Sequence, residues 1–199
     1  MNMMNTKIER VNPEQIDETI MEEAGRLIAE GELVAFPTET VYGLGGDALH
    51  PEAARKIYAA KGRPSDNPLI VHIADFSDME RVAREVPEAA RKLAGAFWPG
   101  PLTMIVWKSD AVPMATTGGM DTVAVRMPNH PVALDLIRKS GCLIAAIRRP
   151  TSSIIVSSIC SGLTRSIFVF IIFTLCFPLY IPSILHRRCF LRCSAKRLS

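Results

Sequence analysis

Acidic residues are confined to the first two-thirds of this chain, and that division limits which part of it can form an ordinary soluble domain. Residues 1–135 contain all 20 Asp and Glu together with 13 Lys and Arg, a net charge of −7. Residues 136–199 contain 10 Lys and Arg and no carboxylate, a net charge of +10. Soluble globular surfaces normally mix both signs. We therefore expect a single globular domain with a sizeable core in the front part of the chain.

The rear part loses the character of a soluble domain after Ala146. Residues 151–185 carry one charge, and residues 166–185 form an uncharged run of 20 residues, which is long enough for a membrane-spanning helix. Two prolines in this run argue against such a helix, although membrane helices tolerate proline better than soluble ones. Three interpretations stay open: a membrane anchor, a strand-rich extension, and an out-of-frame or misassembled continuation of the coding sequence. The abrupt loss of acids and of pattern favours the third.

The front part alternates helical and strand patterns, which predicts an α/β fold with a largely parallel or mixed sheet. Asn12 and Pro13 predict a helix start, and apolar residues then recur at helical spacing until Gly31. Further helices are expected at 51–60, 87–98 and 131–139. Strands are expected at 33–36, 69–73, 102–107, 122–126 and 142–146. The stretch 38–50 contains three glycines and is expected to be a loop.

Several classes of function are excluded by the motifs that the sequence lacks. It contains no GxxxxGK[ST] string, so the chain is not a P-loop protein. Gly43-Leu44-Gly45 loosely resembles a dinucleotide fingerprint, but Pro51 interrupts before the next helix begins. Cysteine is nearly absent from the front part, which fits a reducing cytosol, and no CxxC pair predicts a metal site. The first ten residues have no apolar core and do not form a secretory signal.

Two loops after predicted elements carry residues suited to ligand binding. Small hydroxyl residues and glycines follow Pro37, so backbone and hydroxyl groups could approach a ligand closely there. A plain strand–loop connection explains this segment equally well. Lys61 and Arg63 flank a glycine in a proline-stiffened loop, so both cations could converge on one anion, for which phosphate is the natural candidate. Asn67 could contact a base or ribose edge, and an ordinary solvated loop is the alternative for all three.

Two strand residues and one corner complete the set of candidates. His72 lies in an apolar strand, where a histidine is usually a core residue, but its position just after the cationic loop favours a function. Arg126 ends a strand of small and β-branched residues, and a buried arginine needs an anionic partner, either in the fold or on a ligand. The segment Trp98-Pro99-Gly100-Pro101 is expected to form a structural corner in which the tryptophan packs rather than stacks on a base.

Four strings of residues, taken in order, closely resemble the YrdC family, the threonylcarbamoyl-AMP synthases, over residues 8–146. These strings are PTETVYGLG, KGRPSDNPLIVHI, WPGPLT and DTVAVRMPNHP. The resemblance implies a twisted, open, mixed α/β sheet with flanking helices around a positively charged concave cavity. It divides the chain into a YrdC-like domain at 1–146 and a non-matching tail at 147–199. It also implies a cytoplasmic nucleotidyltransferase that makes L-threonylcarbamoyl-AMP from L-threonine, bicarbonate and ATP, for threonylcarbamoyladenosine modification of tRNA.

The resemblance assigns two sets of binding residues by matching motif. The set for L-threonine is Thr40, His72 and Arg126. The set for ATP is Lys61, Arg63, Asn67 and Thr122, of which the first two would also act in catalysis. Mg²⁺ is expected with the triphosphate, and no metal site made by the protein is expected. The implied partners are tRNA or double-stranded RNA and tRNA-modification proteins, with a membrane added only if residues 166–185 form an anchor.

The chain departs from the family pattern after residues 143–146. The family continues into a Pro-Ser-Ala-Asn segment, a loop and further strands, where this chain has Ile147-Arg148-Arg149-Pro150. The serine and asparagine that complete the family's nucleotide site are absent, and the sheet is expected to be incomplete at its C-terminal end. We therefore expect a poorly folded and weakly active or inactive synthase. The alternatives are an RNA-binding module without synthesis, which the charge of −7 disfavours, and a membrane-tethered inactive homologue.

Overall fold

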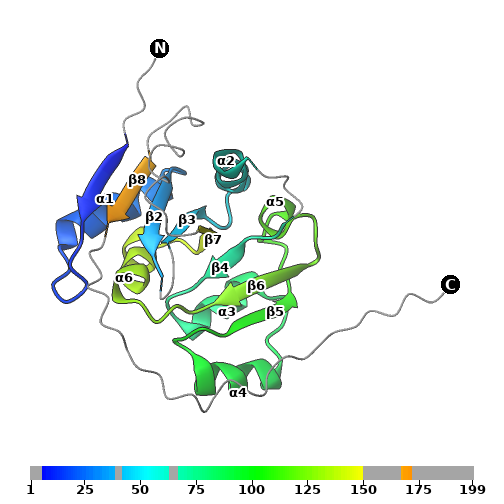
Figure 1. Cartoon of the computed structure of the whole chain (residues 1–199). Coiled ribbons are helices and arrows are strands. Elements are labelled where there is room, and N and C mark those ends of the chain that lie inside the picture. The colour runs from blue at the N-terminus through cyan, green and yellow to red at the C-terminus, as the bar shows by residue number, and fades with distance from the viewer. Residues whose placement is uncertain (1–5, 39–41, 63–66, 150–166, 172–199) are drawn as a thin grey trace, which may run out of the picture.

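The computed structural model describes residues 6–38, 42–62, 67–149 and 167–171, which form a mixed α/β fold (Figure 1). Within these residues an eight-stranded sheet has the strand order β1-β8-β2-β3-β7-β4-β6-β5. The strands are β1 (Lys7–Arg10), β2 (Leu33–Pro37), β3 (Tyr42–Asp47), β4 (Ile70–His72), β5 (Thr103–Trp107), β6 (Thr122–Arg126), β7 (Ile144–Arg149) and β8 (Ile167–Ile171). Pairing is parallel at β1–β8, β2–β8 and β4–β6 and antiparallel at the other junctions, which confirms the predicted mixed sheet.

The helices follow the expected alternation with the strands. They are α1 (Glu18–Ala29), α2 (Pro51–Lys61), η1 (Phe76–Asp78), α3 (Met79–Val82), α4 (Glu88–Phe97), α5 (Met114–Thr117) and α6 (Pro131–Ser140). Both α2 and α6 have proline in the first turn and end at a glycine in the left-handed conformation, with φ of 60° at Gly62 and 64° at Gly141. These are the start and stop signals that favour proline and glycine, and they explain why both helices lie where the sequence predicts them.

Two expectations for the front part are wrong. The first helix begins at Glu18 and not near Pro13, because the Asp17 carboxylate accepts hydrogen bonds from the backbone N–H groups of Thr19 and Ile20 at 2.9 and 3.4 Å. The Asn12 side chain instead accepts from the backbone N–H of Glu14 in a turn. The stretch 38–50 is not a loop throughout, because residues 42–47 form β3, paired with both β2 and β7.

The rear part contributes β8 to the sheet, between β1 and β2. Residues 167–171 therefore form a strand, which argues against the alternative of one spanning helix over 166–185. The rest of that run lies outside the described residues. No helix among the residues that the structure describes is long and apolar enough to cross a membrane. The proposed domain boundary at residue 146 falls within β7, which continues to Arg149, and the division into 1–146 and 147–199 stays a prediction.

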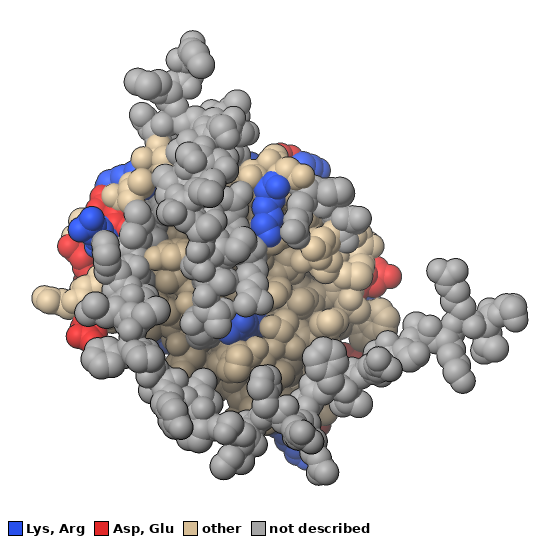
Figure 2. Space-filling view, in the orientation of Figure 1, with Lys and Arg blue, Asp and Glu red and all other residues tan. Residues whose placement is uncertain are grey.

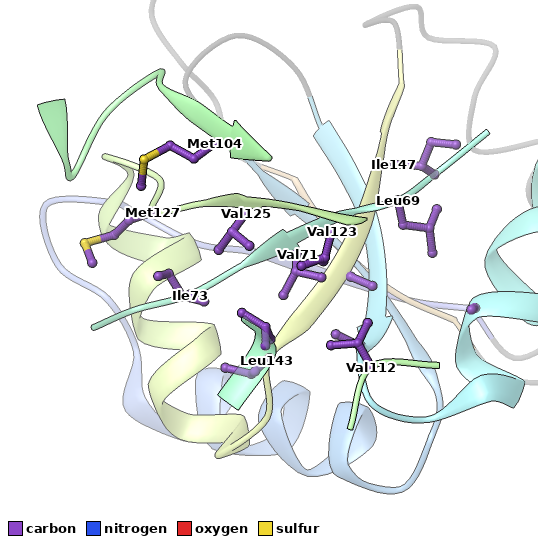
Figure 3. Packing of buried hydrophobic residues seen from close by; sticks show 14 of the residues in the cluster. Leu69, Val71, Ile73, Met104, Val112, Val123, Val125, Met127, Leu143 and Ile147 are labelled. Atoms are coloured by element: carbon purple, nitrogen blue, oxygen red, sulfur yellow. The ribbon is translucent and has the colours of Figure 1, made fainter. Parts of the chain in front are cut away.

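The sheet separates two groups of buried apolar residues. On one face, the side chains of β4, β6 and β7 pack with residues of α2, α3 and α4, and Figure 3 shows Leu69, Val71, Val123, Val125 and Leu143 in this cluster. On the other face, Val34, Phe36, Ile144 and Ala146 pack against α1 and α6. The second group covers the β2, β3 and β7 side of its face. Toward β6 and β5, side chains on that face are half-buried or exposed.

The contact between α1 and α6 leads to a prediction about stability. A Cβ added at Gly25 would lie 2.7 Å from the carbonyl carbon of Lys139 and 2.8 Å from the backbone nitrogen of Ser140. Because backbone atoms cannot move aside without separating the helices, we expect Gly25→Ala to lower the free energy of unfolding by about 1–3 kcal/mol. Thermal and urea denaturation followed by circular dichroism measures this loss.

Gly95 provides the matched control for Gly25. It also lies within a helix, α4, but it is exposed and a Cβ there meets no atom within 4 Å. Gly95→Ala should stabilise the protein by about 0.5–1 kcal/mol, because alanine has fewer unfolded conformations to lose. Equal effects of the two substitutions would contradict the close approach of α1 and α6.

Candidate active site

His72 and Arg126 lie side by side on the face of the sheet that also carries Phe36 and Ile144. The two residues are direct partners in the parallel pair β4–β6. His72 also pairs with Ile144 of β7, and Arg126 pairs with Thr103 of β5. Neighbouring strands are about 4.8 Å apart, and paired residues project to the same face. The fold therefore brings together two of the residues that the sequence predicts for L-threonine.

The imidazole of His72 is held on two sides. It is 6 % exposed, and its Nδ1 lies 3.1 Å from the carbonyl oxygen of Ile70. Because a carbonyl oxygen only accepts, Nδ1 carries the proton in this contact. The ring also meets the Phe36 ring edge-on, with centroids 5.9 Å apart and planes at 85°. These contacts set the direction of Nε2, which lies on the other side of the imidazole.

The glycines of β3 make room for this arrangement. A Cβ at Gly45 would lie 2.8 Å from the Phe36 ring and 2.6 Å from Ile144, and a Cβ at Gly43 would meet the same ring at 3.4 Å. Phe36 can therefore lie across β3 and reach His72 only because both positions lack a side chain. These glycines are expected in a loop, but they form a strand paired with β2 and β7, and they leave the space that the Phe36 ring occupies.

Arg126 is positioned by the corner that joins α4 to β5. Its Nε donates to the carbonyl oxygen of Gly100 at 3.2 Å, and the backbone N–H of Gly100 donates to the carbonyl of Met127 at 2.9 Å. The Trp98–Pro99 peptide is cis, and a Cβ at Gly100 would lie 2.4 Å from the carbonyl oxygen of Phe97. The corner thus holds Nε of Arg126 and thereby sets the orientation of the guanidinium group.

Trp98 confirms the prediction of a structural corner. Its indole N–H donates to the carbonyl oxygen of Leu102 at 2.7 Å, and its ring lies 6.4 Å from that of Phe76 at a tilt of 56°. The residue is half-buried and packs against the core below β5. It therefore stabilises the turn that presents Gly100 to Arg126.

Two of the predicted ATP residues, Asn67 and Thr122, lie at the other end of the same strands. Lys61 is the last residue of α2, and Tyr58 of that helix donates its hydroxyl to the carbonyl oxygen of Asn67 at 2.7 Å. Ile70 pairs with Ala124 in parallel register, so the segment that enters β4 lies at the same end of the sheet as Thr122. Asn67 is exposed and Thr122 half-buried. Arg63 and Thr40 lie outside the described residues.

Covalent catalysis by cysteine finds no support at this site. Cys142 is the free cysteine among the described residues, and it lies two residues before β7. Burial, with a smaller contribution from Asp47, raises the pKa of its thiol to about 11. The group is therefore a neutral thiol near pH 7, and thiols are weak nucleophiles in that form.

The candidate site is cationic and aromatic in character, without a carboxylate among its predicted residues. In the view of Figure 2, acidic side chains lie toward the margins, whereas Lys and Arg side chains also lie near the centre. No group of three or more His, Cys, Asp or Glu in the described part of the chain could hold a metal ion.

Only the structure reveals the outer part of the site. The sequence predicts residues 102–107 only as a strand, yet Ile105 and Trp107 of β5 are exposed on the same face as Thr122 and Arg126. All five residues of β5 except Thr103 are apolar, so the sequence carries no alternation that would separate a buried from an open face. The register with β6 is the signal that places them at the site.

The region that carries the site is similar in sequence to known proteins. The family model Sua5_yciO_yrdC, described as "Telomere recombination", matches residues 26–158. Threonylcarbamoyl-AMP synthase of Pyrococcus abyssi is 58 % identical over 133 residues, which are 67 % of this chain and 39 % of that protein. The protein of the same name from Bacillus subtilis is 58 % identical over 125 residues, 62 % of this chain and 36 % of the relative.

A solved structure is similar in both fold and sequence. The crystal structure of Pyrococcus abyssi Sua5 complexed with L-threonine has a TM-score of 0.76 and 50 % identity, and the match covers 82 % of this chain and half of that one. The chain spans less than two-fifths of the length of the two curated relatives it matches. The matched region contains β2 to β7 with His72 and Arg126. The chain therefore belongs to the Sua5/YciO/YrdC family.

Proposed function

We propose that this chain binds L-threonine and ATP at the His72–Arg126 face and forms L-threonylcarbamoyl-AMP from L-threonine, bicarbonate and ATP. The observation that carries the proposal is the adjacent pair of His72 and Arg126, with the guanidinium directed by Gly100. A relative of 50 % identity whose structure is titled as a complex with L-threonine supports the choice of substrate. The name shared by two relatives of 58 % identity supports the reaction.

The proposed reaction requires positioning and charge stabilisation and no covalent enzyme intermediate. The threonine amine adds to carbon dioxide derived from bicarbonate, loses a proton and becomes a carbamate. A carbamate oxygen then forms a bond to the α-phosphorus of ATP while the bond to the bridging oxygen breaks and pyrophosphate leaves. Holding the two reactants in line supplies much of the rate enhancement, and fixed cations stabilise charge on the phosphoryl group.

Some of the predicted residues are proposed to bind L-threonine and the others to bind ATP. Arg126 is suited to the threonine carboxylate, because a guanidinium binds a carboxylate through two parallel hydrogen bonds. His72 orients the substrate through Nε2, and Thr40 is proposed to complete this subsite. Lys61 and Arg63 would neutralise the phosphates, and Thr122 with Asn67 would contact the nucleotide. Mg²⁺ bound to the triphosphate would shield its charge.

The nucleotide subsite is expected to be weaker than in the family pattern. Residues 147–150 replace the segment with a serine and an asparagine, and β7 extends through Arg149 at this place. Loss of two polar contacts to a charged ligand corresponds to about 2–5 kcal/mol. We therefore expect L-threonine affinity to be retained and synthesis to be slow.

Downstream of this reaction, we propose that the product is used by tRNA-modification proteins in the cytoplasm. Contact with tRNA or double-stranded RNA is a further part of the proposal. An RNA-binding module without catalysis is a weaker candidate, because the relatives are named as synthases and the first 135 residues have a net charge of −7.

The test combines binding with product formation. Isothermal titration calorimetry would measure L-threonine and ATP affinity separately, with L-serine and L-valine as analogues that lack the methyl or the hydroxyl group. Incorporation of labelled bicarbonate into a threonine- and ATP-dependent product would measure the reaction. Failure of the purified chain to bind L-threonine would refute the proposal, whereas RNA binding without any affinity for L-threonine would favour the alternative.

Paired substitutions of His72 test which imidazole nitrogen serves the substrate. Asparagine places its amide near the position of Nδ1 and can keep the hydrogen bond to Ile70, whereas glutamine reaches toward the position of Nε2. We expect His72→Gln to bind L-threonine about tenfold more tightly than His72→Asn, as one retained hydrogen bond of about 1–1.5 kcal/mol allows. Calorimetric titration of both variants gives the comparison, and the reverse order would show that His72 has only a packing role.

A further inference from the structure

Trp107 and Ile105 form an exposed apolar strip on the open face of β5. Their side chains are 55 % and 72 % exposed, whereas Met104 and Val106, which alternate with them, are 7 % and 8 % exposed on the core side. β5 is the edge strand of the sheet. One side of this strand therefore packs against the core, and the indole on the other side can contact a ligand in the site.

The register of β5 on β6 places Trp107 at the nucleotide end of the site. Trp107 pairs with Thr122, and Thr103 pairs with Arg126. Trp107 lies four residues after Thr103, which corresponds to a separation of about 13 Å along the strand. A ligand that starts at Arg126 and extends along β6 therefore reaches the indole at its far end. In the proposed reaction, the part of the bound reactants farthest from the threonine carboxylate is the nucleoside or the terminal phosphates of ATP.

The chemistry of the strip selects between those two parts. An indole face and an isoleucine side chain offer no charge and only one donor, so they do not suit phosphate, for which cationic side chains are the usual partners. A nucleobase has a flat π face that stacks on aromatic side chains, and such stacking contributes substantially to nucleotide affinity. The half-buried hydroxyl of Thr122 beside the indole adds a polar contact for a base edge or ribose.

We propose that Trp107 stacks on the base of ATP and is a positioning residue of the nucleotide subsite, with Ile105 extending the apolar surface beneath the nucleoside. This inference rests on the proposed function and adds the subsite for the base. Every base has a π face, so stacking on an indole does not by itself select adenine over other bases. Trp107 therefore supplies affinity for the base, and discrimination between ATP and GTP comes from other contacts.

Among the residues that the structure describes, Phe97 is the other exposed aromatic residue that could serve the same purpose. Phe97 is 56 % exposed, but it lies at the end of α4 and not on the sheet. Trp98 already has a structural role in the corner. Phe97 is therefore the matched control for Trp107, with similar exposure and aromatic character away from the site.

The experiment compares Trp107→Ala, Trp107→Phe and Phe97→Ala by calorimetry with ATP, AMP, inorganic tripolyphosphate and L-threonine. We expect Trp107→Ala to weaken ATP and AMP binding about tenfold to hundredfold. Trp107→Phe should retain most of the affinity, because a phenyl ring also stacks. Tripolyphosphate and L-threonine should bind all variants equally, and Phe97→Ala should bind ATP like the unaltered protein. In the unaltered protein, ATP and AMP should quench tryptophan fluorescence, whereas tripolyphosphate should not. This quenching should be absent in Trp107→Phe.

Several outcomes would overturn the inference, and they are distinguishable from failure of the proposed function. Unchanged ATP and AMP affinity in Trp107→Ala, with L-threonine still bound, overturns the stacking role alone. Equal weakening of ATP and tripolyphosphate also overturns it, because the effect then does not act through the base. A change of oligomeric state without a change in ATP affinity would assign the strip to an interface between copies of this chain. Absence of both L-threonine and ATP binding by the unaltered protein would overturn the proposed function as well.

Discussion

Arg126→Gln is expected to weaken L-threonine binding about 100-fold or more while leaving the fold intact. Truncating one partner of a desolvated, hydrogen-bonded charge pair typically costs about 2–5 kcal/mol, because the other charge is left without its partner. The threonine carboxylate would lose both its countercharge and its paired hydrogen bonds. Glutamine keeps a side chain of moderate length on β6, so the strand and its neighbours should remain in place.

Calorimetry with L-threonine and a thermal melt together test this expectation. Arg126→Lys separates charge from position: it keeps the positive charge but cannot reproduce the hydrogen bond from Nε to the Gly100 carbonyl oxygen. We expect its L-threonine affinity to fall between those of the unaltered protein and Arg126→Gln.

Arg55→Gln is the control, because Arg55 is an exposed arginine of α2 that pairs with Glu52. Exposed pairs contribute little, so its affinity and stability should be unchanged. Wild-type affinity in Arg126→Gln would remove Arg126 from the site.

Lys61→Met is expected to reduce ATP affinity by about 100-fold and to leave L-threonine affinity unchanged. Lys61 ends α2 where Gly62 turns the chain, at φ of 60°, toward the predicted cationic loop. A phosphate contact made by an ammonium group is a charge-assisted hydrogen bond of about 1.5–3 kcal/mol. Methionine preserves the length and apolar stem of the side chain and removes the charge.

The salt dependence of ATP binding provides a second measurement for Lys61. Screening by salt weakens attraction between exposed charges, so the unaltered protein should lose more affinity than Lys61→Met between 50 mM and 500 mM salt. Lys92→Met is the matched control, because Lys92 is an exposed lysine of α4 that pairs with Glu88. Its ATP affinity should match that of the unaltered protein. The same loss of affinity in both variants would indicate a general effect of net charge and would contradict a specific phosphate contact at Lys61.

The class of the fold and most of its elements were predictable from local sequence signals. Proline in the first turn and glycine after the last turn mark α2 and α6, and both helices lie within one residue of the ranges expected for them. The short β-branched run at 122–126 forms β6 as predicted. These signals act within a few residues of one another, so the sequence alone carries them.

The errors arose where tertiary packing overrides local propensity. Glycine-rich sequence predicts a loop at 42–47, but the residues form β3 because they pair with both β2 and β7. The Phe36 ring occupies the space that side chains at Gly43 and Gly45 would need. Asn12 and Pro13 have the residue types of a helix start, yet the Asp17 carboxylate caps α1 five residues later. The strand at 167–171 forms by pairing with β1 and β2, and no local sequence pattern predicts this pairing.

The sequence by itself determined the residue types available to the candidate site, and the tertiary structure decided which of them meet. His72 and Arg126 are far apart in the chain, and only the parallel register of β4 and β6 makes them neighbours. Trp107 looks like one more apolar strand residue until its pairing with Thr122 places it on the open face. The physical reason is that side-chain chemistry is local, whereas proximity on a sheet depends on strand order and register, which are set by packing across the whole domain.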